Sequence, residues 1–377
     1  MLFRDVIGHD VLKQQLINNV NNHRLSHAQL FLGPEGSGNL ALALAFAQYI
    51  QCRNKGPEDA CGTCPSCLKL KKLEHPDLHF FFPVATNKEI DKKPRSQLFY
   101  KYWREMLLKT TYFRYYQWLE KIGIENKQAI INADDCNDII RTLGLKTYES
   151  PFKIVIIWMV EKLFHAAAPK LLKVLEEPPE NTIFLLVSEN RDLILNTILS
   201  RTQLVKVPRL TDQEIEQGLL TQYGCGEDQA RQIAFQAAGN FNEALRLLQT
   251  NNEPLEDFNQ FRDWMRLCFS TDIAGILKWV DGFSKAGREK HKTLLHYGLN
   301  VFRTCLLYMY QTPSLIRLEG QEKEFVQKFS PFINEHTAPM IIQEFSLAIA
   351  HVERNANSKI LFTDLSLKLA GLLKSSR

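Results

Sequence analysis

Residues 28–50, which read AQLFLGPEGSGNLALALAFAQYI, decide the class of fold. The apolar segment 28–32 predicts a short buried strand, and the Ala- and Leu-rich segment 40–50 predicts a helix. Between them stands the glycine-rich turn GPEGSG, at 33–38. A strand, a glycine-rich turn and a helix in this order are typical of a nucleotide-binding α/β unit.

The segments on either side extend the same pattern. Further buried strands are expected at 153–157, 182–187 and 204–207, and further helices at 11–22, 139–143 and 166–175. Pro208 ends the last strand, and the helix-start sequence TDQE at 211–214 opens a region with helical signals to the end of the chain. The sequence therefore predicts an α/β domain followed by helices, with a linker at 251–254.

Length and composition limit the classes of protein that remain. The chain has 377 residues, of which 45% are hydrophobic and 23% charged, so two or three globular domains are expected. Its net charge of +4 is too small to indicate nucleic-acid binding by itself. The N-terminus lacks the apolar core of a signal peptide, and no apolar run reaches the length of a membrane span. We therefore expect a cytoplasmic protein with reduced cysteines and no membrane partner.

The glycine-rich turn fits the frame of a phosphate-binding loop, G-x-x-x-x-G-K-[ST], but lacks its two chemical side chains. Gly33, Gly36 and Gly38 suit a loop whose backbone N–H groups surround a phosphate. Asn39 stands where a lysine would reach the β- and γ-phosphates, and Leu40 where a hydroxyl would bind Mg²⁺. Taken alone, the turn fits a decayed phosphate loop and an ordinary glycine-rich turn equally well.

The strand expected at 153–157 has lost the matching chemistry. In an ATPase such a strand would end in two acids, one for Mg²⁺ and one to activate water. Here it ends in Trp158 and Met159, and Glu161 stands three residues too far along. Two independent losses at the two expected places favour an ATPase fold that does not hydrolyse ATP.

Four of the eight cysteines are clustered with the spacing C-x₈-C-x₂-C-x₂-C, at Cys52, Cys61, Cys64 and Cys67. Four thiolates at this spacing suit a tetrahedral Zn²⁺ ion, and because sulfur fills every position the site is expected to be structural. Free thiols and an iron–sulfur cluster remain as alternatives. His75 is a weaker candidate ligand, because a role in a turn or at the surface is favoured for a residue that precedes Pro76. The other cysteines are isolated and expected to pack as small apolar residues: Cys136, Cys225, Cys268 and Cys305.

Residues 84–127 differ from their surroundings and are expected to form an insertion. The segment is rich in aromatic, lysine and arginine residues, which is compatible with stacking on single-stranded nucleic acid. Acidic residues interrupt the basic run, at Glu89, Asp91, Glu105 and Glu120. This mixture favours aromatic side chains that pack on the parent domain or on a neighbouring chain.

Five segments in a fixed order resemble a known family. They are FRDVIGH at 3–9, SHA at 26–28, the GPEGSG turn, LLKVLEEPPENTIFLL at 171–186 and LSRT at 199–202. Together they resemble the AAA+ subunits of bacterial clamp loaders, which belong to the DNA polymerase III holoenzyme. The resemblance covers about residues 1–250, and beyond them it rests mainly on helical patterning and on ERNAN at 353–357. The insertion departs from the family's pattern.

The resemblance implies three domains. Residues 1–208 are expected to form a RecA-like AAA+ domain, a parallel sheet with helices on both faces, which carries the zinc module at 52–67 and the insertion at 84–127. Residues 209–250 would form a helical lid, and 255–377 a helical collar that joins a hetero-oligomeric ring. The implied partners are gamma/tau-like and delta-like clamp-loader subunits and, through the complex, the sliding clamp and primer–template DNA. A similar zinc module in the family supports zinc as the cofactor.

The resemblance also implies a role for Arg201. The family's Ser-Arg-Cys motif, which places an arginine finger in an adjacent ATP site, reads Ser200-Arg201-Thr202 here. In the lid, Asn242 stands where active members carry an arginine that contacts nucleotide. The expected function is a stator subunit that hydrolyses no ATP and lends Arg201 to a neighbour during clamp loading. Two alternatives remain: an active gamma/tau-like ATPase subunit of the same complex, and a zinc-dependent DNA-binding module.

Overall fold

The computed structural model describes residues 1–124, 127–249, 256–310, 320–354 and 356–375. Contacts divide the chain into two compact units, Met1–Gln249 and Thr250–Arg377. The linker expected at 251–254 lies outside the described residues.

The first unit is built on a parallel five-stranded sheet. Its strands are β1 (Ala28–Leu32), β2 (Leu78–Phe81), β3 (Lys153–Trp158), β4 (Thr182–Ser188) and β5 (Gln203–Lys206), in the order β2-β3-β4-β1-β5. Every residue of β3 and β4 is buried, because helices cover both faces of a parallel sheet. The strands expected at 153–157, 182–187 and 204–207 are confirmed within one residue at either end.

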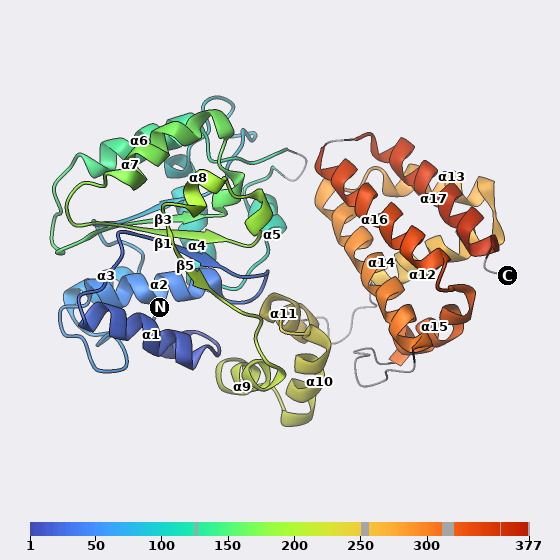
Figure 1. Ribbon diagram of the computed structural model, residues 1–377, viewed down its shortest axis with the longest axis horizontal. Coiled ribbons are helices and arrows are strands. Elements are labelled where there is room, and N and C mark those ends of the chain that lie inside the picture. Colours follow the sequence, from blue (N-terminus) through green and yellow to red (C-terminus); the bar gives the residue numbers. More distant parts are fainter. Residues whose placement is uncertain (125–126, 250–255, 311–319, 355, 376–377) are drawn as a thin grey trace. The chain divides into compact units, whose positions relative to one another are not determined.

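Helices form a layer on each face of this sheet (Figure 1). One face carries α1 (Asp10–Asn21), α2 (Asn39–Gln51) and α3 (Pro65–Lys71), and the other carries α6 (Ala133–Leu143) and α7 (Ala168–Glu176). Alternate strand residues supply the two cores: Ile154 and Ile156 pack in the core of α2, whereas Val155 and Ile157 pack in the core of α6 and α7. The predicted doubly covered α/β domain is thereby confirmed.

The insertion adds α4 (Tyr100–Lys109) and α5 (Tyr115–Lys121) to this unit. Its two tryptophans are buried; Trp103 stacks on Phe82 with ring centroids 4.4 Å apart, and Trp118 meets Phe82 edge-on at 5.0 Å. Both tryptophans belong to the core that also contains α2. Packing of the aromatic residues on the parent domain, the favoured interpretation of their composition, is therefore confirmed.

Three helices follow the last strand: α9 (Asp212–Tyr223), α10 (Glu227–Ala237) and α11 (Phe241–Gln249). The predicted helix start at 211–214 is confirmed as a capping box, in which the Thr211 hydroxyl accepts the Glu214 amide and the Glu214 carboxylate accepts the Thr211 amide. A short helix, α8 (Asn196–Leu199), precedes β5.

The second unit is helical, as its sequence predicts. It consists of α12 (Glu256–Ser270), α13 (Ile273–Phe283), α14 (Arg288–Met309), α15 (Gly320–Phe329), α16 (Thr337–Glu353) and α17 (Ser358–Ser375). At its centre the buried Trp264 stacks on Trp279 at 5.0 Å and donates its indole N–H to the Ser366 hydroxyl. Among the described residues, no helix combines the length and apolar character needed to cross a bilayer.

Candidate functional site

The glycine-rich loop lies at the carboxyl end of β1, the strand that pairs with both β4 and β5. Gly36 and Gly38 have φ angles of +73° and +86°, which are strained for any residue with a side chain. Gly38 is the N-cap of α2, so the loop ends directly at the N-terminus of a helix. The backbone architecture of a phosphate site is therefore present.

Asn39 is turned into the fold and makes all its contacts there. Its Nδ2 donates to the carbonyl oxygens of Gly33, at 3.2 Å, and Ser188, at 3.0 Å, and its Oδ1 accepts the Leu40 amide at 2.8 Å. The residue is 6% exposed, and Leu40 is buried in the apolar core. The amide thus ties the loop to the end of β4, and neither side chain reaches toward a phosphate.

Apolar side chains fill the end of β3, where an ATPase would hold its acids. Trp158 is 2% exposed and lies 5.1 Å from the ring of Trp103 and 5.3 Å from that of Phe113. Met159 is also buried. This end of the strand therefore anchors the insertion and presents no metal ligand or general base.

Two carboxylates do lie near this edge. Glu161, which sequence reasoning set aside as too distant, accepts the Glu189 amide at 3.0 Å, next to the end of β4. Burial raises the pKa of Glu161, and burial together with the nearby Glu35 and Glu161 raises the pKa of Glu189 well above its usual range. Glu189 directly follows β4 and stands two residues beyond the segment expected as a strand, 182–187; its place near the end of a buried strand is the signal that could have found it.

The lid, formed by α9, α10 and α11, contacts the glycine-rich loop. Asn242, near the start of α11, donates its Nδ2 to the Phe113 carbonyl at 3.2 Å and is 8% exposed. The side chain that replaces the expected arginine is therefore bonded to the insertion.

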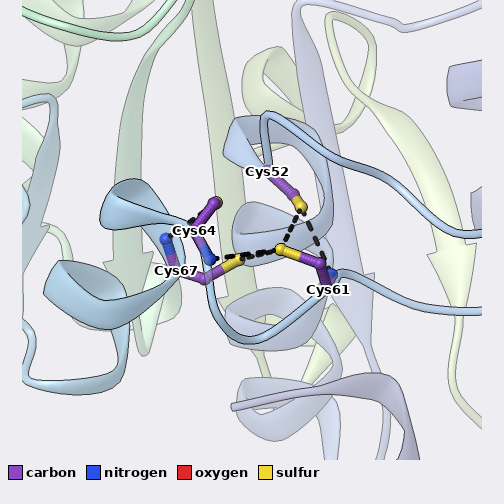
Figure 2. A group of neighbouring side chains, drawn as sticks. All are labelled: Cys52, Cys61, Cys64 and Cys67. Atoms are coloured by element: carbon purple, nitrogen blue, oxygen red, sulfur yellow. Dashed lines mark hydrogen bonds between the residues drawn. The ribbon is translucent and has the colours of Figure 1, made fainter.

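Figure 2 shows the four clustered cysteines, with Cys52 at the end of α2 and Cys64 and Cys67 at the start of α3. The Sγ atoms of Cys52 and Cys61 are 3.5 Å apart, those of Cys61 and Cys67 are 3.9 Å apart, and all four lie within 4.8 Å of one another. Sulfurs bound tetrahedrally at about 2.3 Å from zinc stand about 3.8 Å apart. The cluster can therefore hold one metal ion, whereas an iron–sulfur cluster needs room for several iron and sulfide atoms.

Backbone N–H groups favour the thiolate at Cys61, whereas burial opposes the thiolate at two other cysteines of this cluster. The amides of Cys61 and Cys64 donate to the sulfurs of Cys52 and Cys61, each at 3.3 Å. The amides of Cys64 and Thr63 lower the pKa of the Cys61 thiol to about 6, whereas burial raises the pKa of Cys52 and Cys67. A divalent cation would favour the thiolate at all four positions.

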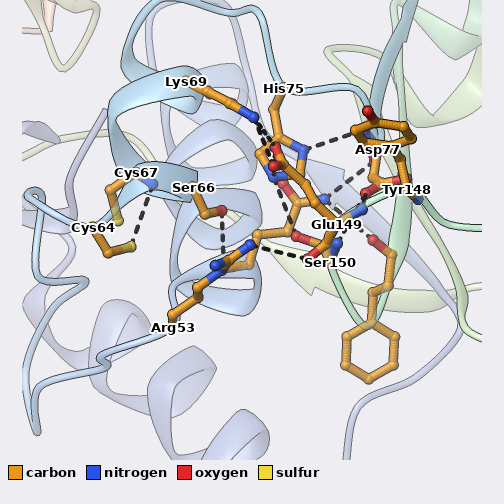
Figure 3. A network of polar contacts seen from close by, with 12 residues as sticks. Arg53, Cys64, Ser66, Cys67, Lys69, His75, Asp77, Tyr148, Glu149 and Ser150 are labelled. Carbon is orange, nitrogen blue, oxygen red and sulfur yellow. Dashed lines mark hydrogen bonds and ion pairs between the residues drawn. The ribbon is translucent and has the colours of Figure 1, made fainter.

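A polar network fastens α3 to the α/β core (Figure 3). Lys69 of α3 forms an ion pair with Glu149 at 2.6 Å, and Asp77 accepts the backbone amides of Tyr148, Glu149 and Ser150 at 2.7–3.0 Å. His75 lies in this network and not in the cysteine cluster. His75 is therefore not a metal ligand; it is buried, and its bonds to Asp77 and Ser150 agree with the favoured role in a turn but not with one at the surface.

Both ring nitrogens of His75 face the polar network around Asp77. Its Nδ1 accepts the Asp77 amide at 3.1 Å, and its Nε2 lies 3.2 Å from the Ser150 hydroxyl.

Of the isolated cysteines, Cys136, Cys268 and Cys305 are buried as expected. Cys225 differs: it is half-buried and bonded to the Gln229 side chain at 3.3 Å.

Arg201 follows α8 and is held by three acceptors. Its Nε donates to Glu176 Oε1 at 2.5 Å, and its Nη1 donates to the Thr197 carbonyl at 2.9 Å and to the Ser200 hydroxyl at 3.1 Å. The side chain is 32% exposed. An always-charged guanidinium is thus held in a fixed place at the surface of the first unit.

The strand that carries the glycine loop lies between β4 and β5, and a three-helix lid follows the last strand, which together define the chain as an AAA+ protein. Residues 8–211 match the family described as DNA polymerase III, delta subunit. The chain belongs to this family and is a subunit of the DNA polymerase III clamp loader.

Relatives of this chain carry matching names. It is 26% identical to the DNA polymerase III subunit delta′ of Bacillus subtilis (strain 168), over 92% of this chain and 90% of that protein. It is 29% identical to the subunit delta′ of Haemophilus influenzae, over 60% of this chain and 55% of that protein. It is also 25% identical to the DNA polymerase III subunit gamma of Buchnera aphidicola, over 66% of this chain and 58% of that protein.

Proposed function

We propose that this chain is the non-hydrolysing stator, or delta-prime, subunit of the clamp loader, and that it supports ATP-dependent loading of the sliding clamp onto primed DNA. The observation that carries the proposal is the inward turn of Asn39, whose amide is bonded to Gly33, Ser188 and Leu40. A side chain used in this way contributes nothing to phosphate binding.

ATP hydrolysis needs charge neutralisation that this site lacks. Phosphoryl transfer is accelerated almost entirely by a lysine, a metal ion and positioned polar groups around the phosphates. Here a neutral amide, a buried leucine and a buried tryptophan stand at the corresponding positions, at Asn39, Leu40 and Trp158. We therefore infer that the chain neither hydrolyses ATP nor binds it tightly.

Any catalytic contribution is then made in trans, through Arg201. Its guanidinium is partly exposed and is fixed by Glu176, Thr197 and Ser200. A planar, permanently charged fork suits the negative charge that grows on a γ-phosphate. We infer that Arg201 projects into the ATP site of an adjacent subunit as an arginine finger.

The clustered cysteines are inferred to hold one structural Zn²⁺ ion. The four sulfurs lie within 4.8 Å of one another, which suits tetrahedral S₄ coordination. Because sulfur fills every coordination position, no position is left for water. The ion would therefore stabilise the segment 52–67 without taking part in chemistry.

The remaining parts are assigned by the same reasoning. Residues 1–208 would be the AAA+ domain, 209–250 the lid, and 255–377 a collar through which the chain joins a ring. The partners would be gamma/tau-like and delta-like subunits, with the clamp and primer–template DNA reached through the complex. The similarity to the Buchnera gamma subunit keeps an active gamma/tau-like role as a second candidate, but Asn39, Leu40 and Trp158 weigh against it.

Co-purification tests the proposal as a whole. The tagged full chain, co-expressed with gamma/tau and delta subunits from the same genome, should be recovered with them as one complex of defined native mass. The same preparation should contain zinc by elemental analysis. A chain that stays monomeric in the presence of these subunits would contradict the proposed role.

A further inference from the structure

Three consecutive residues of the insertion, Tyr112, Phe113 and Arg114, stand between α4 and α5. Each contacts a different part of the candidate nucleotide site, although the site lies far from them in the sequence. We call them the 112–114 segment. The stator function proposed above rests on other residues, so the contacts of this segment need an explanation of their own.

Tyr112 fills the space beside the start of α2. It is 7% exposed, and its hydroxyl accepts the Ile7 amide at 3.0 Å. Its ring lies 4.8 Å from the ring of Phe241, the first residue of α11. A Cβ placed on Gly38 would lie only 3.1 Å from the tyrosine oxygen. The ring therefore lies against the N-terminal segment, the loop and the lid at once.

Phe113 joins the lid to the end of β3. Its carbonyl oxygen accepts the buried Asn242 Nδ2 at 3.2 Å, and its ring lies 5.3 Å from that of Trp158. The backbone of the segment thus runs across the edge of the sheet where an ATPase would expose its acids.

Arg114 forms ion pairs with both the loop and the lid. Its Nε lies 3.0 Å from Glu35 Oε1 in the loop, and its Nη2 donates to Glu243 Oε2 in α11 at 2.5 Å. The Arg114 side chain is 16% exposed, against 23% for Glu243 and 38% for Glu35, so water screens the pair with Glu243 less than the pair with Glu35. Removing one partner of such a pair leaves a poorly solvated charge behind.

The loop and the lid also form hydrogen bonds with each other directly. The Phe241 amide donates to the Gly36 carbonyl at 3.0 Å, and Asn240 Nδ2 donates to Glu35 Oε1 at 3.0 Å. A Cβ on Gly36 would lie 1.8 Å from Asn240 Oδ1. The space in front of Gly36 is therefore occupied by the lid itself.

We propose that the 112–114 segment is a built-in plug that occupies the candidate nucleotide site and holds the lid closed on the loop. The inference rests on the proposed function in one respect, since it takes this site to be a decayed nucleotide site. It adds that exclusion of ATP has two independent causes: lost phosphate chemistry and an occupied site. A permanently closed lid gives the unit one shape through the ATP cycle of its neighbours.

Four versions of the full chain separate the two causes. They are the wild type, Asn39→Lys/Leu40→Thr with the loop chemistry restored, Tyr112→Ala/Arg114→Ala with the plug removed, and the combination of all four substitutions. Binding of Mg·ATP to each is measured by equilibrium dialysis, and circular dichroism checks that each is folded. We expect the combined variant to bind Mg·ATP at least about tenfold more tightly than the restored loop alone, and the other two versions to show no measurable binding.

Two outcomes overturn the plug. The first is a restored loop that binds ATP as tightly as the combined variant, and the second is a combined variant that is folded and still binds no ATP. These results differ from failure of the proposed function, which would appear as ATP binding or turnover by the wild type itself.

Hydrogen exchange on gentler variants keeps the test independent of truncated side chains. Arg114→Gln retains most of the buried volume, and it should speed exchange of the Phe241 amide, which donates to the Gly36 carbonyl, about tenfold, because the lid is no longer clamped. Arg104→Gln is the matched control, since Arg104 also lies in the insertion and pairs with Glu74, away from loop and lid. Unchanged exchange in Arg114→Gln, or equal acceleration in both variants, would overturn the clamping role.

Discussion

Replacing Arg201 by alanine tests whether this chain serves a neighbour's ATP site. Within the chain, the substitution removes an ion pair whose side chains, Arg201 and Glu176, are 32% and 46% exposed. Exposed pairs of this kind contribute about 1 kcal/mol or less. The variant should therefore fold and assemble normally, with a melting temperature lowered by no more than roughly 2–4 °C.

The effect on the adjacent ATP site should be far larger than the effect on stability. An arginine finger accelerates phosphoryl transfer by about 10³–10⁵, which corresponds to about 4–7 kcal/mol of transition-state stabilisation. Only the ATP site that receives Arg201 loses this acceleration. The rate of ATP hydrolysis by the whole ring should therefore fall by the fraction that this one site contributes. Arg201→Lys should restore little activity, because an ammonium group lacks the planar fork.

The assay is single-turnover ATP hydrolysis by the reconstituted complex, measured together with clamp loading onto primed DNA. Arg231→Ala is the matched control, because Arg231 also pairs with a glutamate, Glu216, and is 72% exposed on the lid helix α10. Arg201→Ala should remove one site's share of the fast phase, whereas the control should not. Hydrolysis and loading at wild-type rates by an assembled Arg201→Ala complex would refute the finger and leave the chain a scaffold.

Three further predictions concern the cysteine module and two carboxylates, Asp77 and Glu189. Cys64→Ser should lower the zinc content well below one ion per chain by elemental analysis and speed hydrogen exchange across 52–67, while the α/β core stays folded. Asp77→Asn should lower the free energy of unfolding by about 2–4 kcal/mol at pH 7, since charge-assisted hydrogen bonds contribute about 1.5–3 kcal/mol each and an amide nitrogen accepts none. Burial alone would raise the pKa of Asp77, but the N–H groups of Glu149, Tyr148 and Ser150 lower it. In urea unfolding, the wild type should therefore be more stable than the variant above the ordinary carboxyl pKa. This difference in stability should disappear as the pH falls through the lowered pKa. Glu189→Gln should raise the melting temperature of the first unit by roughly 2–4 °C at pH 8 in calorimetry, because burial raises the pKa of Glu189 and its ionisation weakens the fold as the pH rises.

Each of these predictions has a clear contrary result. Full zinc content in Cys64→Ser, or iron in place of zinc, would exclude the proposed metal site; Cys136→Ser, at a buried cysteine outside the cluster, is the control for loss of a thiol. For Asp77, a constant difference from the wild type between pH 7 and pH 2 would exclude the carboxylate as its source. For Glu189, the gain should shrink as the pH falls toward 5, and a gain independent of pH would show that ionisation is not its cause.

The sheet was largely predictable, and its one missed strand has a physical reason. Buried parallel strands are continuous apolar runs, so 28–32, 153–157 and 182–187 stood out from their surroundings. The missed strand, β2 (Leu78–Phe81), contains His79 and lies between the cysteine cluster and the insertion. His79 interrupts its apolar run, so the segment does not stand out as the three longer buried strands do.

The composition of the candidate site was predictable, but its closure was not. Asn39, Leu40 and Trp158 could be identified by position alone, because a phosphate loop and its partner strand follow fixed frames. Tyr112 and Arg114 belong to no motif. Their contacts with Ile7 and Glu243 join residues 105 and 129 positions apart, and nothing local in the sequence specifies such pairs.

ATP turnover by the purified full chain tests the central claim most directly. With the chain alone and saturating Mg·ATP, phosphate release should equal that of a protein-free blank, because Asn39 and Trp158 supply neither charge nor a metal ligand. Asn39→Ala purified in parallel should give the same background rate and so reveal any contaminating ATPase. Magnesium-dependent turnover by the wild type that disappears in Asn39→Ala would contradict the account and make the chain an active subunit of the clamp loader.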